Sequence, residues 1–366
     1  MSPKFLLVWD RMGDYHRSRW KALADAVGNA NVIACDLGKS DTLYQWENSE
    51  KEHNYFLLSN RPVNQVKPWH VLGAFVALIR KQGITHVCIA GYGRLAYLAM
   101  IIVAKMTGKK VLLFAESWYA SNRVADNLKG LFIRLFVDAF LVSGNRAKAH
   151  FSGRLGISPE KIAEGYSVVD NVHFSNMSPG RGDISPTLLC VARFAAEKNL
   201  SLLIEAFQTS ALLANGWELK IVGGGPLKAE MENKINTTQI KLLDWVSYEE
   251  LPSLYHNSNC FILPSLFEPW GLVVNEAMAA GLPIIVSEQC GCAPDLVQTT
   301  NGWIFDAKDK VSLDIVFNNL SLLSSEQLTQ KGQSSQEIIA NYTPEVWAKN
   351  VLKVLGVPIL QKNASN

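Results

Sequence analysis

Residues 261–280 read FILPSLFEPWGLVVNEAMAA, and this segment carries the pattern that decides the fold of the chain. The apolar residues up to 263 predict a buried β-strand, the segment 268–271 predicts a turn, and the residues after it predict a helix. A strand followed by a turn and a helix is the repeating unit of a parallel α/β sheet. The free N–H groups and the positive dipole end at the start of such a helix suit an anion such as a diphosphate.

The same alternation extends along most of the chain. Apolar runs bounded by turn residues predict strands at 4–9, 31–35, 55–59, 86–90, 111–115, 139–142, 187–191, 218–222, 240–243, 260–263 and 283–286. Segments with a 3.6-residue apolar period predict helices at 16–27, 69–81, 95–106, 125–137, 199–213, 227–235, 251–258, 272–280 and 344–355.

The stretch 175–186, rich in Pro and Gly, interrupts the alternation and predicts a linker. We therefore expect an α/β protein with two Rossmann-like, doubly wound domains, at 1–174 and 187–342, that face a central cleft. Residues 343–366 are expected to form a helix that packs back toward the N-terminal domain, followed by a frayed tail. Ligands of open α/β sheets bind beyond the carboxyl ends of the strands, so functional residues are expected in the loops there.

The chain has 366 residues, of which 48% are hydrophobic and 19% are charged, so it can build large cores and is not a disordered protein. Its net charge of +2 conceals an imbalance. Residues 1–172 hold 22 Lys and Arg against 14 Asp and Glu, whereas residues 173–366 hold 13 against 19. The basic half suits an anionic substrate or a membrane surface. It lacks the dense cationic stripe of a nucleic-acid binder, so we expect no nucleic-acid partner.

The cysteines and the apolar runs bear on the cellular compartment. Four of the six cysteines lie in strand-like apolar runs and the other two flank a single glycine, a pattern typical of reduced thiols rather than a disulfide framework. The first apolar run ends at Asp10, too early for a secretory signal. No apolar run approaches the ~20 residues of a transmembrane helix. We expect a cytoplasmic protein, either soluble or peripheral at the inner face of the membrane.

Charged residues follow two of the strands predicted for the second half. Glu268 lies in the turn of the opening segment, and Glu276 lies eight residues later in the helix, so the two carboxylates can address different hydroxyls of one ligand. Arg193 and Lys198 follow the strand at 187–191, where a planar guanidinium and a point charge suit a leaving diphosphate. Solvated helix carboxylates and ordinary surface cations are the alternative interpretations. The turn GGGP at 223–226 permits close backbone approach, although such turns are often only structural.

The order and spacing of four segments resemble one known family. These segments are VARFAAEKNLSLLIEAF (191–207), IVGGGPL (221–227), LYHNSNCFILPSLFEPWGLVVNEAMAAGLPIIVSEQCGCAPDLV (254–297) and NGWIF (301–305). They resemble the donor domain of retaining, nucleotide-sugar-dependent glycosyltransferases of the GT-B architecture, the family-four or "group 1" type. The resemblance implies an acceptor-side domain at 1–174 and a nucleotide-sugar donor domain at 187–342. It also implies a UDP- or GDP-linked co-substrate and no other cofactor.

The resemblance implies roles for the four charged residues. Glu268 matches the first motif glutamate, which contacts the donor sugar near the reacting centre. Glu276 matches the second, which bonds to the ribose hydroxyls. Arg193 and Lys198 match the pair that neutralises the diphosphate. In this family the transfer retains the anomeric configuration, and the leaving phosphate helps to deprotonate the acceptor on the same face.

The resemblance also implies backbone contacts to the donor. The amides of Gly271, Leu272 and Val273 match those that hold the distal phosphate, and the base would lie against the loops around Gly224 and Val246. The chain contains no Asp-x-Asp, so a metal site of the kind used by the other major glycosyltransferase architecture is not indicated.

The first half departs from the family in two of its loops. The loop after the first strand offers Gly13 alone where paired glycines are usual, and His16 opens the next helix as either a substrate contact or a cap. The strand at 111–115 is followed by Glu116 where many relatives have a histidine directed at the donor sugar. Glu116 would bind an acceptor hydroxyl or transfer a proton, unless it caps a helix or forms an ion pair. The sequence leaves open whether Glu116 or His16 replaces that histidine.

Lys129 and Arg134 flank the apolar residues Leu131, Phe132, Ile133, Leu135 and Phe136. The helix that carries them either packs on the sheet or lies on an anionic membrane. The expected function is that of a hexosyltransferase-type retaining enzyme, independent of metal, in glycan, glycolipid or glycoside biosynthesis. Its expected partners are a nucleotide sugar and a hydroxyl acceptor, anionic or lipid-linked if the basic half contacts the acceptor. The alternatives are a sugar-nucleotide epimerase or a phosphorylase of the same architecture, or an inactive nucleotide-sugar-binding subunit.

Overall fold

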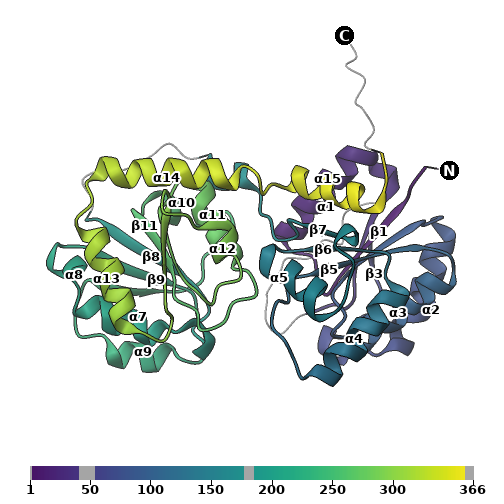
Figure 1. Cartoon of the computed structure of the whole chain (residues 1–366), viewed down its shortest axis with the longest axis horizontal. Coiled ribbons are helices and arrows are strands. Elements are labelled where there is room, and N and C mark those ends of the chain that lie inside the picture. Colours follow the sequence, from purple (N-terminus) through teal and green to yellow (C-terminus); the bar gives the residue numbers. More distant parts are fainter. Residues whose placement is uncertain (1, 41–53, 177–184, 359–366) are drawn as a thin grey trace, which may run out of the picture. The chain divides into compact units, whose positions relative to one another are not determined.

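The computed structural model describes residues 2–40, 54–176 and 185–358. The chain divides into two compact units, Met1–Val168 with Pro344–Asn366 and Val169–Thr343, both drawn in Figure 1. Most of the predicted linker, residues 177–184, lies outside the described residues, as does the predicted frayed tail at 361–366. Among the described residues, none of the helices is long and apolar enough to cross a membrane.

A parallel sheet with the strand order β3-β2-β1-β4-β5-β6-β7 forms the centre of the first unit. Its strands are β1 (Phe5–Trp9), β2 (Val32–Asp36), β3 (Tyr55–Leu57), β4 (His86–Ala90), β5 (Lys110–Ala115), β6 (Ala139–Val142) and β7 (Ile162–Glu164). The central strands are almost wholly buried, because helices cover both faces of the sheet.

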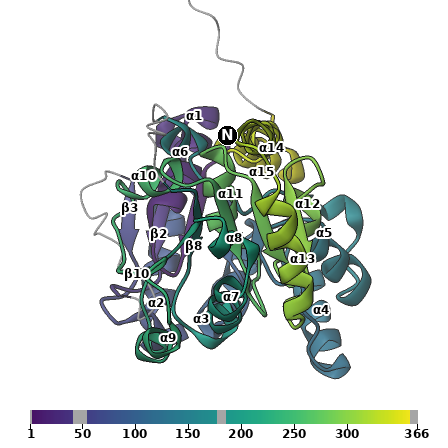
Figure 2. The same cartoon turned by 90° about the vertical axis from the view of Figure 1, so that its left-hand side faces the viewer.

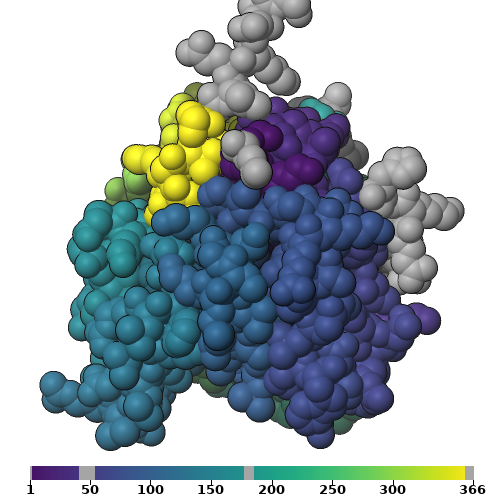
Figure 3. Space-filling model, turned by 90° about the vertical axis from the view of Figure 1, so that its right-hand side faces the viewer, coloured from purple at the N-terminus to yellow at the C-terminus, as the bar shows by residue number. Residues whose placement is uncertain are grey.

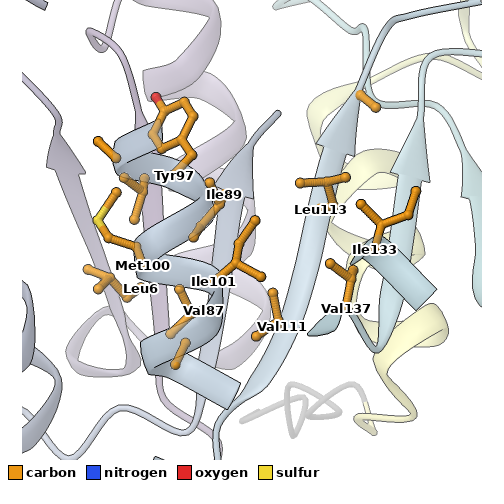
Figure 4. Packing of buried hydrophobic residues seen from close by; sticks show 14 of the residues in the cluster. Leu6, Val87, Ile89, Tyr97, Met100, Ile101, Val111, Leu113, Ile133 and Val137 are labelled. Carbon is orange, nitrogen blue, oxygen red and sulfur yellow. The ribbon is translucent and has the colours of Figure 1, made fainter. Parts of the chain in front are cut away.

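The helices of the first unit are α1 (Asp14–Val27), α2 (Pro68–Lys81), α3 (Leu95–Met106), α4 (Arg123–Phe136), α5 (Asn145–Ala149) and α15 (Pro344–Leu355), with short turns η1 (Asn29–Asn31), η2 (Val63–Gln65), η3 (His150–Arg154) and η4 (Pro159–Lys161). Helices α1 and α15 pack together, while α2, α3 and α4 form a second layer. Figure 4 shows the core between this second layer and the sheet, where Met100 and Ile101 of α3 lie near Leu6 and Val87.

The second unit repeats this plan with a parallel sheet of order β10-β9-β8-β11-β12-β13. Its strands are β8 (Thr187–Val191), β9 (Glu218–Val222), β10 (Ile240–Leu243), β11 (Cys260–Leu263), β12 (Ile284–Ser287) and β13 (Gly302–Phe305). Its helices are α6 (Asn171–Ser175), α7 (Leu200–Gln208), α8 (Ala211–Ala214), α9 (Lys228–Lys234), α10 (Leu251–His256), α11 (Leu272–Ala279), α12 (Ala293–Leu296), α13 (Lys310–Ser321) and α14 (Ser325–Ile339), with the turn η5 (Ala196–Lys198). Helices α7, α9 and α13 cover one face, and α10, α11 and α14 the other (Figures 1 and 2).

These observations confirm the predicted α/β class with two Rossmann-like sheets. Every predicted strand is present with its ends within two residues of the prediction, but β7 and β13 were not predicted. The helix predicted at 199–213 is wrong as a single helix. It breaks at Thr209 because the Ser210 side chain accepts a hydrogen bond from the Leu213 N–H at 3.3 Å and starts α8.

The boundary between the units also differs from the prediction. The first unit ends at Val168 rather than at residue 174. The reason is that Phe174 on α6 is buried and packs edge-on against Tyr248 and Tyr255, which belong to the second unit. Helix α6 is therefore the first element of the second unit.

Each sheet has one point at which the strand order reverses, between β1 and β4 in the first unit and between β8 and β11 in the second. The loops that leave such a pair of strands diverge and form the crevice in which ligands of doubly wound sheets bind. In the second unit these loops carry Arg193, Lys198 and Glu268, and in the first unit they begin at Asp10 and Gly91.

Candidate functional site

An ion pair between Lys198 and Glu268 joins the two loops at the switch point of the second sheet. Lys198 ends the short turn η5 after β8, and its Nζ donates to the Glu268 Oε2 in the loop after β11. Each side chain is only 14% exposed, so the pair is partly shielded from water and from salt. The sequence predicted both residues as functional, and the structure brings them together.

The backbone around Glu268 is held at several points. Its N–H donates to the Gln289 carbonyl at 3.2 Å, and its carbonyl accepts from the Gly291 N–H at 2.9 Å. Gly271 caps α11 with φ of +102°, and a Cβ there would lie 2.9 Å from the Leu263 side chain, so glycine is required. The Glu268 carboxylate therefore lies on a loop whose backbone is held at Glu268 itself and at Gly271.

Helix α11 places its first turn beside this carboxylate. Leu272 and Val273 form the start of the helix and are partly buried. The first N–H groups of a helix have no partner within it and carry the positive end of its dipole. The predicted phosphate-binding backbone thus adjoins the Lys198–Glu268 pair.

Arg193, the second predicted cation, forms an ion pair with its neighbour on the same loop. Its Nη2 lies 2.8 Å from the Glu197 Oε1, and both side chains are more exposed than the Lys198–Glu268 pair. Exposed pairs of this kind are weak. The Arg193 guanidinium therefore lies at the carboxyl edge of the second sheet and is held only weakly by Glu197.

Glu276 lies in a different setting from the one that its predicted role suggests. The residue is fully buried within α11, and its Oε2 accepts a hydrogen bond from the Tyr255 hydroxyl at 2.6 Å. Tyr255, also fully buried, packs against Phe174 of α6. A ribose reaches this carboxylate only if a neighbouring side chain or loop moves.

The glycine-rich turn after β9 packs closely on the loop after β8. Gly223 and Gly225 have φ of +150° and +152°, and a Cβ at either would meet backbone atoms of Ala192 or Phe194. Gly224 lies against the indole of Trp245, which is 59% exposed and directly precedes Val246. The predicted base site around Gly224 and Val246 therefore carries an exposed aromatic surface on which a base can stack.

In the first unit, Gly13 and His16 form one local structure at the start of α1. The Gly13 N–H donates to the His16 Nδ1 at 3.1 Å, and the ring lies 4.9 Å from that of Trp9. Burial, followed by the charge of Arg19, lowers the pKa of His16 well below its usual value. The ring is therefore neutral near pH 7 with its proton on Nε2, which suits a hydrogen-bond donor rather than a base.

Asp36, at the end of β2, holds the same loop from the other side. Its carboxylate accepts from the Met12 N–H at 2.8 Å and from the Tyr55 hydroxyl at 2.7 Å. Burial raises the pKa of Asp36 to about 6, although both hydrogen bonds and the charge of Arg11 oppose the shift. The loop that carries Gly13 is thus hydrogen-bonded to the Asp36 carboxyl group, whose pKa is raised to about 6.

Glu116 follows β5, and its Oε1 accepts a hydrogen bond from the Ser167 hydroxyl at 2.7 Å. Ser167 is fully buried. The neighbouring Tyr166 ring lies 4.7 Å from the buried Arg19 guanidinium, and burial raises the pKa of Tyr166 to about 12. Glu116 is therefore an anchored carboxylate at the carboxyl edge of the first sheet.

Sequence reasoning did not identify three residues that shape these sites, namely Tyr255, Trp245 and Ser167. Tyr255 and Ser167 contact their carboxylates across long sequence separations, so no local pattern indicates them. Trp245 follows β10, and its place at a carboxyl edge was the available signal.

Comparison with known proteins identifies the second unit. The family model described as glycosyl transferases group 1 matches residues 174–334. An amylovoran biosynthesis glycosyltransferase of Erwinia amylovora is 26% identical over 277 residues, which cover 69% of this chain and 65% of that protein. An uncharacterized glycosyltransferase of Methanocaldococcus jannaschii is 29% identical over 155 residues, which cover 41% of this chain and 39% of that protein. The chain thus spans less than two thirds of the length of these relatives.

A solved structure extends the likeness to the whole fold. Anabaena HepE in complex with UDP and glucose has a TM-score of 0.75 at 14% identity, covering 97% of this chain and 99% of that one. Two Rossmann-like sheets of this kind define the GT-B class of glycosyltransferase folds. Within that class, residues 174–334 of the chain match the group 1 glycosyltransferase family.

Proposed function

We propose that the chain transfers a sugar from a UDP- or GDP-linked donor to a hydroxyl acceptor, with retention of the anomeric configuration and without a metal ion. The observation that supports this most is the Lys198–Glu268 pair at the switch point of the family's domain, next to the first turn of α11. A cation, a carboxylate and a helix N-terminus at one sheet edge match the diphosphate and the hydroxyls of such a donor. The UDP bound by the similar HepE supports the nucleotide class.

Lys198 is suited to its role by the chemistry of the ammonium group. An ammonium has three donor positions, so Lys198 can keep its bond to Glu268 while it donates to a phosphate oxygen. In the proposed transfer, the bond between the anomeric carbon and the β-phosphate oxygen breaks and the acceptor oxygen bonds to that carbon. The acceptor proton passes to the leaving phosphate. Lys198 and Arg193 stabilise the negative charge that develops on the diphosphate.

The proposed acceptor lies on the first unit. Glu116, held by Ser167, accepts a hydrogen bond from an acceptor hydroxyl, and the neutral His16 donates one. The excess of cations over carboxylates in residues 1–172 supports an anionic acceptor or carrier.

A thermal-shift screen of UDP, GDP, ADP and their common sugars tests the donor class, because a ligand that binds the native state raises the unfolding temperature. We expect the uridine or guanosine compounds to stabilise the protein most. Stabilisation by none of them would contradict the proposal.

Incubation of the stabilising sugar nucleotide separates the alternatives. An epimerase converts the donor without acceptor, a phosphorylase releases sugar phosphate only with inorganic phosphate, and an inactive subunit binds without turnover. A transferase releases nucleoside diphosphate in step with glycoside formation, and NMR of the product anomer reports retention.

A further inference from the structure

Arg19 on α1 is a buried cation. The residue is 2% exposed, and its guanidinium lies 4.7 Å from the centre of the Tyr166 ring. Its Nη2 donates a hydrogen bond to the Val168 carbonyl at 2.9 Å, while its Nε has no hydrogen-bond partner in the described part of the chain. Burial of an arginine costs free energy unless a carboxylate and a full set of acceptors compensate it. The position of Arg19 therefore indicates a role other than stabilising the fold.

The two contacts of Arg19 lie on either side of Ser167. Tyr166 and Val168 are buried, and Ser167 between them is fully buried. The Tyr166 N–H donates to the Val142 carbonyl at the end of β6 at 3.0 Å. The segment 166–168 is thus held by the sheet at its first residue and by the Arg19 guanidinium at its first and last residues.

This segment reaches Glu116 in two ways. The Ser167 hydroxyl donates to the Glu116 Oε1 at 2.7 Å. The Tyr166 ring stacks on Phe114, two residues before Glu116, with 5.0 Å between the ring centres. Both the hydroxyl that holds the carboxylate and the end of the strand that carries it therefore contact the segment that Arg19 holds.

Helix α15 shields this region from solvent. It packs against α1, and Figure 3 shows its yellow residues beside purple residues near the N-terminus. Trp347 on α15 is fully buried, and its ring lies 5.5 Å from that of Phe114. Hydrogen bonds in such a region are stronger than in water, because the local dielectric is low. The contacts of Arg19 are therefore suited to fixing a geometry.

We infer that Arg19 is a positioning residue for Glu116. It fixes Tyr166 and Val168 and thereby keeps the Ser167 hydroxyl on the Glu116 carboxylate. A binding group needs such support, because its side chain must stay within about 0.5 Å of the productive geometry. The inference rests on the proposed function for the contact between Glu116 and the acceptor, and it goes beyond that function by naming the residue that holds the carboxylate in place.

Crystal structures of the wild type, Arg19→Met and Lys21→Met test the first link without any turnover. Lys21→Met is the matched control, because Lys21 is an exposed cation on the same helix. We expect Arg19→Met to fold, since an apolar side chain replaces a buried charge, and to lose the hydrogen bond between Ser167 and Glu116. Lys21→Met should retain this bond. Retention of the bond in Arg19→Met, or failure of that variant to fold, would overturn the inference.

Transfer kinetics test the second link, with octyl glucoside, octyl galactoside and octyl mannoside as acceptor probes. Arg19→Met should lower kcat/KM for the acceptor at least about tenfold and leave the dissociation constant of the nucleotide unchanged, because a misplaced contact weakens only the acceptor geometry. Arg19→Lys keeps the charge and a donor for the backbone, so it should restore part of the loss.

A double-mutant cycle separates positioning from an independent effect. In a Glu116→Gln background, Arg19→Met should lower kcat/KM little further, because Arg19 acts through that carboxylate. Losses that multiply in the double variant, or an equal loss of nucleotide affinity, would overturn the inference. No transfer by the wild type to any of the probes would count against the proposed function alone, and the crystal structures would still decide the role of Arg19.

Discussion

The two sheets have the same strand order at their centres, and each places an ion pair at the point where that order reverses. In the first unit Asp10 follows β1 and Arg94 follows the loop after β4; in the second unit Lys198 follows β8 and Glu268 follows β11. The signs are thus reversed between the units. The Asp10–Arg94 pair is about one-third exposed, while the Lys198–Glu268 pair is 14% exposed.

The geometry of the two pairs indicates different tasks. The Arg94 fork donates to both oxygens of Asp10 at 2.8–3.0 Å, and the Tyr97 hydroxyl donates to the same carboxylate at 2.7 Å. A bidentate fork with a third donor fixes a loop. A lysine paired with one carboxylate oxygen keeps donors for a second anion. The same strand order therefore places an ion pair that fixes a loop in the first unit and a candidate diphosphate site in the second unit.

The largest expected effect is on the second pair. Lys198→Ala should lower the transfer rate by about 100-fold or more, as the loss of one preorganised group that stabilises developing charge does. Steady-state rates with the stabilising donor check this. Lys234→Ala is the control, since Lys234 forms an exposed ion pair with Glu230 and an exposed hydrogen bond to Ser201, and it should leave the rate unchanged. A normal rate in Lys198→Ala would show that the Lys198–Glu268 pair has only a structural role, like the Asp10–Arg94 pair.

Glu276 and Tyr255 provide the next test within the second unit. If Glu276 binds ribose, Glu276→Ala should raise the dissociation constant of the nucleotide by about tenfold, since hydrogen bonds to a charged group contribute about 1.5–3 kcal/mol. Tyr255→Phe removes only the hydroxyl that bonds to this buried carboxylate, and it should lower both stability and nucleotide affinity. Calorimetric titration and thermal unfolding separate the two effects. Reduced stability with unchanged affinity in both variants would give the pair a purely structural role.

Asp36 provides a pH test confined to the first unit. Its pKa is raised in the folded state, so its protonated form stabilises the fold fully below the usual Asp pKa near 4, and this stabilisation is lost as pH rises through about 6. The loss should be on the order of 2 kcal/mol, and Asp36→Asn should flatten the stability profile between these limits. Denaturant unfolding from pH 4 to 7 measures it. An unaltered slope in the variant would assign the pH dependence to other groups.

The smallest effect is expected at the first ion pair. Arg94→Ala should cost about 1 kcal/mol of stability, because the pair is partly exposed to solvent. It should leave nucleotide affinity unchanged. If Arg94→Ala lowered nucleotide affinity as much as Lys198→Ala does, the proposal that only the pair in the second unit binds the diphosphate would be wrong.

The sequence predicted most strands and the positions of Lys198 and Glu268, because buried parallel strands are short apolar runs and functional loops follow them directly. It did not predict β7, which has only three residues, or β13, whose sequence GWIF begins at a glycine after the polar stretch QTTN. It also did not predict the burial of Glu276 or the anchoring of Glu116 by Ser167, since both depend on contacts between distant segments. The sequence left open whether the apolar segment at 131–136 packs on the sheet, because periodicity marks an apolar face without showing what covers it. In the structure Ile133 is buried, whereas Leu131 and Leu135 are exposed.

The most direct test of the account is a calorimetric titration of UDP and GDP into the wild type, Lys198→Ala and Arg94→Ala. The account predicts that the wild type binds at least one of these nucleotides, that Lys198→Ala binds it at least about tenfold more weakly, and that Arg94→Ala binds it with wild-type affinity. Equal affinities in the wild type and Lys198→Ala, or a selective loss in Arg94→Ala, would contradict the assignment of the diphosphate site to the second unit.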